Sequence, residues 1–353
     1  MTEAAVSPAP GPAPADEEIL TVSDLHSFIV TDGGIVRAVD GVSFTLRRGE
    51  ILGLVGESGS GKSVTCRTLM GLMPSPPTRW SGDVRYAGLP DRNLLDVGGR
   101  ELQRLRGAHL SMIFQDPMSA LNPVMRVGDQ IEEAVASHDH LGQRDRRRRA
   151  IELLDRVGIP AAERRMRGYP HEFSGGMRQR VLIAVAIASR PKILFADEPT
   201  TALDVIIQDQ ILSLLLELQR DSGMSMVLVS HDLGVIAEMC DRIAVMYGGQ
   251  IVELGDTEAL LTAPRHPYTI SLLRSLPDAD VRARFLPSII GTPPELIDVE
   301  PGCRFAPRCP LVTPECRTWE TELLAAEGGA QLVRCRRHDD ARRPAAWPDQ
   351  SFV

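Results

Sequence analysis

The clearest chemistry in the sequence belongs to a glycine-rich segment at residues 56–63, GESGSGKS. It matches the pattern G-x-x-x-x-G-K-[ST], after an apolar run at 51–55 and before an expected helix at 63–72. Glycines let the backbone curl so that several N–H groups point at one phosphate, and the helix adds its positive N-terminal end. The lysine can reach the β- and γ-phosphates, and the last serine can ligate Mg²⁺. We therefore predict a nucleotide site made by Gly56, Ser58, Gly59, Ser60, Gly61, Lys62 and Ser63.

Two carboxylates follow a second apolar run, at 193–196. A strand buried on both faces ends in two acids only where something nearby requires them. Asp197, at the strand end, is placed to hold Mg²⁺ through water, and Glu198 is then the candidate general base for the attacking water. His231 follows another apolar run, at 226–229, and is expected to contact the γ-phosphate.

A second phosphate-binding feature lies at Ser174, Gly175 and Gly176. The serine stands where an N-cap belongs, and the two glycines open an expected helix at 175–189, so this helix start can also bind an anion. Because one chain already has one phosphate cradle, a second one predicts ATP shared between two subunits.

The order of these motifs resembles that of ABC ATPases, and the resemblance covers about residues 20–260. Residues 173–177, FSGGM, resemble the family signature, whose usual form is LSGGQ. Gln115 lies in a Q-loop-like segment, which implies contact with the metal and the water and coupling to a membrane subunit. Asp204 ends a D-loop-like segment at 201–204, which implies a contact across the dimer. The family's usual aromatic residue for adenine is missing from its expected place, and Phe28 is the nearest aromatic.

The family resemblance implies an α/β fold with a mostly parallel core sheet, an antiparallel β subregion and a helical subdomain. The alternation of apolar runs and helical stretches independently favours a parallel sheet covered on both faces. Residues 74–110 are expected to form a small irregular or β region, and residues 120–170 are expected to be helical.

The segments at 266–269 (HPYT) and 302–310 (GCRFAPRCP) resemble the C-terminal extension of oligopeptide and dipeptide permease ATPases. This resemblance implies ATP-driven peptide import, with two transmembrane permease subunits, a paralogous second ABC ATPase and an external solute-binding protein as partners. Related systems import nickel chelates or oligosaccharides, so those solutes stay open. A soluble ABC ATPase that does not transport is a further alternative, although this chain has one cassette and no long heptad stretch.

Four cysteines crowd the C-terminal part in the spacing C-x5-C-x6-C-x18-C. Four thiolates suit zinc or an iron–sulfur cluster, although zinc sites usually open with a tighter pair. Free cysteines are the third possibility, and the peptide-permease resemblance implies a structural [4Fe-4S] cluster. The expected ligands are Cys303, Cys309, Cys316 and Cys335, whereas Cys66 and Cys240 are expected to be buried apolar residues.

Composition limits the remaining possibilities. The 353 residues carry a formal net charge of -8 and only 4% aromatics, which gives no support for a nucleic-acid partner. No apolar run approaches the ~20 residues that span a bilayer, and the N-terminus lacks the pattern of a signal peptide. We expect a disordered tail at 1–18, an ATPase domain at 19–265 and an extension at 266–353, located at the cytoplasmic face of the membrane through a partner.

Overall fold

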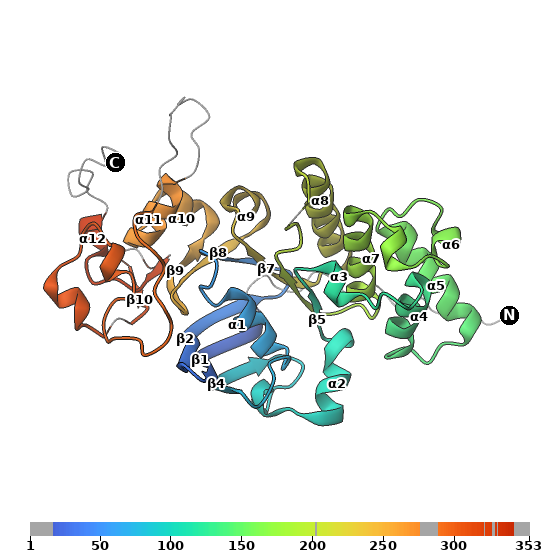
Figure 1. Cartoon of the computed structure of the whole chain (residues 1–353), viewed down its shortest axis with the longest axis horizontal. Coiled ribbons are helices and arrows are strands. Elements are labelled where there is room, and N and C mark those ends of the chain that lie inside the picture. Colours follow the sequence, from blue (N-terminus) through green and yellow to red (C-terminus); the bar gives the residue numbers. More distant parts are fainter. Residues whose placement is uncertain are drawn as a thin grey trace.

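The computed structural model describes residues 17–201, 203–275, 289–320, 322–326, 329 and 331–341 (Figure 1). Most of the predicted N-terminal tail, residues 1–16, lies outside this range. Within it, two sheets form the frame of the molecule, one of eight strands and one of three.

The larger sheet has the order β10-β11-β9-β8-β3-β7-β6-β5. Its parallel part comprises β3 (Ile51–Val55), β5 (Leu110–Ile113), β6 (Ile193–Asp197), β7 (Ser225–Ser230) and β8 (Arg242–Tyr247). Strands β3, β5, β6 and β7 are buried along their whole length, as apolar strands of a parallel sheet with both faces covered should be. The predicted mostly parallel core is confirmed.

The smaller sheet is antiparallel, with the order β2-β1-β4. It comprises β1 (Glu18–Thr31), β2 (Gly34–Arg47) and β4 (Thr78–Tyr86). Helix α1 (Lys62–Leu69) lies between this sheet and the main one, and the Thr68 hydroxyl donates to Ser27 Oγ at 3.1 Å. The region at 74–110, predicted to be irregular or β, contains β4 and the turn η1 (Leu94–Asp96), but it also contains helix α2 (Gly99–Ala108), which was not predicted.

Helices fill the stretch between β5 and β6 and gather at one end of the molecule (Figure 1). They are α3 (Pro117–Ala120), α4 (Val127–Ala136), α5 (Gln143–Arg156), α6 (Ala162–Arg165), the turn η2 (Pro170–Glu172) and α7 (Gly175–Ile187). Apolar side chains of α4, α5 and α7, including Val135, Leu153 and Val181, are fully buried in a common core. The predicted helical region is therefore a subdomain of several short helices.

The remaining helices of the ATPase part are α8 (Val205–Ser222), α9 (Leu233–Met239) and α10 (Thr257–Thr262). In the described residues, no helix is long and apolar enough to cross a membrane.

The C-terminal segment joins the main sheet instead of folding apart from it. Strand β9 (Gln250–Asp256) pairs antiparallel with β8, and β11 (Gln331–Val333) and β10 (Leu324–Ala325) continue the sheet beyond it. The segment also contains α11 (Pro267–Arg274), η3 (Ala306–Arg308), η4 (Pro314–Arg317) and α12 (His338–Ala341). The division at 265/266 stays a prediction, and strand pairing now crosses that boundary.

Candidate nucleotide site

The loop at 56–63, called the phosphate loop below, connects β3 to α1, and its backbone conformation requires the glycines. Gly56 has φ +151°, and a Cβ there would lie 2.1 Å from the carbonyl oxygen of Met246. Gly61 has φ +103°, and a Cβ there would lie 2.2 Å from the carbonyl oxygen of Ala38. Any side chain at either position would collide with backbone, so the sequence forces a tight loop at the end of the buried strand.

Lys62 lies at the centre of this loop. Its Nζ donates to the carbonyl oxygens of Gly56 at 2.7 Å and Glu57 at 2.9 Å, and it lies 3.4 Å from Ser60 Oγ. Burial lowers the pKa of the ammonium, while Glu198, Asp197 and Glu57 act in the opposite direction. The loop thus holds a buried cation, and Ser58 and Gly59 form its exposed rim.

Ser63 and Asp197 meet at 2.6 Å, Oγ to Oδ1, although they are 134 residues apart. Asp197 is fully buried, and burial raises the pKa of its carboxyl. Its second oxygen, Oδ2, has no hydrogen-bond partner among the described residues, and the nearest cation, Arg67 Nη2, is 3.9 Å away. A buried acceptor without a donor costs free energy, and a water bound to Mg²⁺ would satisfy it. The pair therefore fits the predicted metal position.

Glu198 is the point at which the other predicted catalytic residues converge. Its Oε2 accepts from Gln115 Nε2 at 3.0 Å and from Thr201 Oγ1 at 2.8 Å, and it lies 3.5 Å from His231 Nδ1. The backbone holds Glu198 at φ +46°, a left-handed conformation that non-glycine residues rarely adopt. A cavity of about 240 Å³ opens beside Glu198, Thr201 and His231. The sequence places Thr201 in the D-loop-like segment at 201–204, but it does not predict the contact between Thr201 and Glu198.

The signature residues lie elsewhere. Ser174 caps α7 by accepting from the N–H of Met177 at 3.3 Å. A Cβ on Gly176 would meet Ile207 Cγ2 at 2.6 Å, and one on Gly175 would meet Leu203 at 3.6 Å. Helices α7 and α1 are well separated in Figure 1. The structure of one chain thus brings the signature beside the 203–207 segment and not to the phosphate loop.

Asp204 is the N-cap of α8, where its Oδ1 accepts from the N–H of Ile207 at 3.0 Å. Ala202, in the same D-loop-like segment, lies outside the described residues. Phe28, the nearest aromatic to the expected adenine contact, lies beneath the guanidinium of Arg37 at 5.6 Å.

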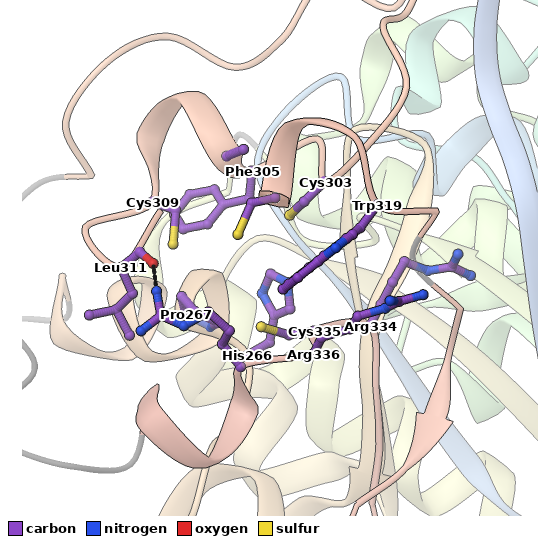
Figure 2. Close-up of a pocket in the computed structure, with 13 residues that line it drawn as sticks. His266, Pro267, Cys303, Phe305, Cys309, Leu311, Trp319, Arg334, Cys335 and Arg336 are labelled. Atoms are coloured by element: carbon purple, nitrogen blue, oxygen red, sulfur yellow. Dashed lines mark hydrogen bonds between the residues drawn. The ribbon is translucent and has the colours of Figure 1, made fainter. Parts of the chain in front are cut away.

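The four C-terminal cysteines line one cavity together with His266, Phe305 and Trp319 (Figure 2). All four are free thiols, and so are the buried Cys66 and Cys240. Burial raises the pKa of the Cys303 thiol, and it raises the pKa values of Cys309 and Cys335 to about 12. Across the described ranges, no group of three or more His, Cys, Asp or Glu side chains is placed to hold a metal ion.

Comparison with known proteins agrees with this geometry. Residues 39–201 match a family described as ABC transporter, and residues 252–316 match the oligopeptide/dipeptide transporter C-terminal region. The dipeptide transport ATP-binding protein DppD of Escherichia coli is 47% identical over 326 residues, which cover 92% of this chain and 99% of DppD. The chain belongs to the family of ATP-binding subunits of oligopeptide and dipeptide ABC transporters.

Further relatives of this ABC ATPase give the same result. DppD of Bacillus subtilis is 49% identical over 83% of this chain and 87% of its own length. The oligopeptide transport ATP-binding protein OppD of Bacillus subtilis is 49% identical over 82% of this chain and 81% of its own length. Among solved structures, the ATP-binding cassette MJ0796, in a dimeric post-hydrolysis state bound to ADP and Pi, superposes with a TM-score of 0.60. It is 27% identical and covers 67% of this chain and 98% of its own, so the fold is that of an ABC ATPase.

Proposed function

We propose that this chain binds and hydrolyses ATP to drive the import of oligopeptides or dipeptides, working at the cytoplasmic face of the cell membrane. The observation that carries the hydrolytic part is the convergence of Gln115, Thr201 and His231 on one carboxylate oxygen of Glu198. That carboxylate follows directly after Asp197, which the Ser63 hydroxyl contacts at 2.6 Å. These contacts support a base, a metal position and a phosphate loop in one site, where β3 and β6 end at the same edge of the sheet.

The residues divide the reaction among them. The N–H groups of the loop and the Lys62 ammonium bind the phosphates, and Ser63 and Asp197 are the residues that would hold Mg²⁺. Mg²⁺, when bound, neutralises charge that develops on the phosphate oxygens. Glu198 takes the proton from water as the water oxygen bonds to the γ-phosphorus and the β–γ bridging bond breaks. Gln115 orients that water and His231 contacts the γ-phosphate. ADP and phosphate are the products.

A second ATPase subunit completes the site. Ser174, Gly175 and Gly176 lie away from the phosphate loop of their own chain, so we propose that they bind the γ-phosphate held by a partner. Asp204, beside them, would contact that partner. The partner is expected to be a paralogous ABC ATPase. Light scattering of Glu198→Gln with ATP tests this: dimerisation of the chain alone would favour a homodimer, and dimerisation only with the paralogue a heterodimer.

The transported solute and the other partners rest on the family. DppD and OppD are named for dipeptide and oligopeptide transport. We propose two transmembrane permease subunits and an external solute-binding protein as partners, and no nucleic acid. The test is ATP-dependent uptake of a labelled dipeptide into proteoliposomes that contain the permeases and solute-binding protein encoded by the neighbouring genes. Lys62→Ala is the inactive control. Uptake of a nickel chelate or an oligosaccharide instead of the peptide would reassign the solute, and no stimulation of ATP turnover by the permeases would favour a non-transport role.

We further propose that Cys303, Cys309, Cys316 and Cys335 hold a [4Fe-4S] cluster with a structural role. The support is that four partly buried thiols line one cavity without disulfides. A cluster binds each thiolate to a different iron, so it needs a wider spacing than a single zinc ion with four sulfurs at ~2.3 Å. Iron, sulfide and zinc analysis of anaerobically purified protein tests this. Stoichiometric zinc without iron would replace the cluster by zinc, and neither metal would leave four free cysteines.

A further inference from the structure

Glu57, the second residue of the phosphate loop, is held mainly by the C-terminal extension. Its N–H donates to the hydroxyl of Tyr268 at 2.9 Å, and its carboxylate receives both terminal nitrogens of Arg308, at 2.6 and 3.0 Å. Its carbonyl oxygen accepts from Lys62 at 2.9 Å. Three groups of one loop residue are therefore fixed, two of them by residues more than 200 positions away.

Arg308 has a side chain that is buried and fully hydrogen-bonded at this position. Its side chain is 5% exposed, and every N–H of its guanidinium has an acceptor within reach. Besides Glu57, these are the Tyr247 hydroxyl at 3.3 Å and the carbonyl oxygens of Ile289 at 3.2 Å and Ile290 at 3.0 Å. A forked, fully used guanidinium fixes both the position and the orientation of the carboxylate it holds.

The same segment leads into the cysteine cavity. Arg308 ends η3, and Cys309 follows it as the next residue. Phe305 precedes η3, lines the cavity and is 1% exposed (Figure 2). Its ring lies 5.4 Å from that of Tyr268 and 5.2 Å from that of Tyr247, in contacts typical of packed aromatic side chains. One short turn thus has one side in the cysteine cavity and the other on the phosphate loop.

We propose that Arg308 is a positioning residue for the phosphate loop and acts through Glu57. Through this contact, nucleotide affinity depends on an intact cysteine cavity. This inference rests on the proposed ATP site. A loop that is held before the nucleotide arrives loses less conformational freedom on binding. A change in the cysteine cavity shifts η3 and releases Glu57. The loop then has to become ordered when the nucleotide binds, which lowers the affinity.

The test measures the Kd of the full chain for a trinitrophenyl-ATP probe. For Arg308→Ala we expect about a tenfold increase, equal to ~1.4 kcal/mol. Arg308→Lys keeps the charge but not the fork, so its Kd should fall between those of Arg308→Ala and the wild type. Arg92→Ala is the matched control, because it removes an exposed Arg–Glu pair, in which Nη1 donates to both carboxylate oxygens of Glu101 at 2.6 and 2.8 Å, and which does not involve the loop. The control should bind within twofold of wild type.

Two further variants identify the route of the effect. In a Glu57→Gln background, Arg308→Ala should add less than twofold, since coupled residues are not additive. Cys309→Ser should also raise Kd, and this increase should vanish in the Arg308→Ala background. In steady-state hydrolysis the increase should appear in KM with kcat retained, because uniform binding is what is lost.

Several results would overturn the inference. They are a Kd for folded Arg308→Ala within twofold of wild type, additive effects of the Glu57 and Arg308 changes, or a Cys309→Ser effect that persists without Arg308. If Arg308→Ala does not fold, Glu57→Gln and Arg308→Lys carry the test, and unchanged Kd values for both would refute it. A wild-type chain that does not bind the probe would instead refute the proposed ATP site.

Discussion

Replacement of Glu198 by Gln separates chemistry from binding at this site. The contacts from Gln115, Thr201 and His231 all go to Oε2, at 3.0, 2.8 and 3.5 Å. A glutamine can place its amide oxygen at that position, so both hydrogen bonds and the local fold should survive. The other carboxylate oxygen becomes an NH₂ group, which cannot accept a proton from water. The variant therefore loses the general base and little else.

The expected loss follows from this geometry. General-base catalysis contributes ~10²- to 10⁴-fold, which corresponds to ~3 to 5 kcal/mol of barrier. We expect kcat to fall by that factor while the Kd for ATP changes by less than about threefold, within ~0.7 kcal/mol. Phosphate release at saturating ATP measures the first quantity and probe displacement the second. Glu101→Gln, an exposed change on α2, is the control and should keep full turnover. Retention of more than a tenth of wild-type kcat by Glu198→Gln would refute Glu198 as the base.

Three other predictions test the loop, the metal position and the extension. Gly61→Ala should abolish nucleotide binding because its Cβ would lie 2.2 Å from the Ala38 carbonyl oxygen. Gly59→Ala, at φ +79° with open space around the Cβ, should cost only ~1–2 kcal/mol of binding free energy. Equal Kd values for the two variants would contradict the clash. Ser63→Ala should raise the Mg²⁺ concentration for half-maximal hydrolysis, since the hydroxyl 2.6 Å from Asp197 is lost, and an unchanged Mg²⁺ titration would argue against this metal position. A chain ending at Ser275 loses β11, which exposes the edge of β9. We expect this truncated chain to have a lower melting temperature and to self-associate on gel filtration. A truncated chain that stays a stable monomer would contradict this prediction.

The parts predictable from sequence are those whose determinants are contiguous. The loop at 56–63 and the strand ending in Asp197 each carry their own signal, because a strand, a turn and a helix start are local in the chain. The convergence of Gln115 and His231 on Glu198 could also be expected, since neighbouring parallel strands end at one edge of the sheet. The contact between Ser63 and Asp197 follows from a wider form of this rule, because β3 and β6 flank β7 and end at the same edge of the sheet.

What the sequence did not reveal depends on non-local pairing. Strand β11 is only three residues long, and its partner β9 lies about 80 positions earlier, so no periodicity could identify it. Helix α2 was missed because it contains glycines and arginines and buries only Leu105, which leaves a weak apolar pattern. The contact between Thr201 and Glu198 depends on the left-handed backbone at Glu198, which residue type does not predict.

The phosphate loop itself shows where a motif stops being sufficient. The pattern G-x-x-x-x-G-K-[ST] leaves position 57 free, yet here Glu57 is the loop residue that the extension holds through Tyr268 and Arg308. Glycines make the loop able to bind phosphate, but they also increase the entropy that must be lost when it becomes ordered. Contacts from 211 and 251 residues away therefore supply an order that the motif cannot. The affinity of this loop for nucleotide is therefore expected to depend on the extension as well as on the motif.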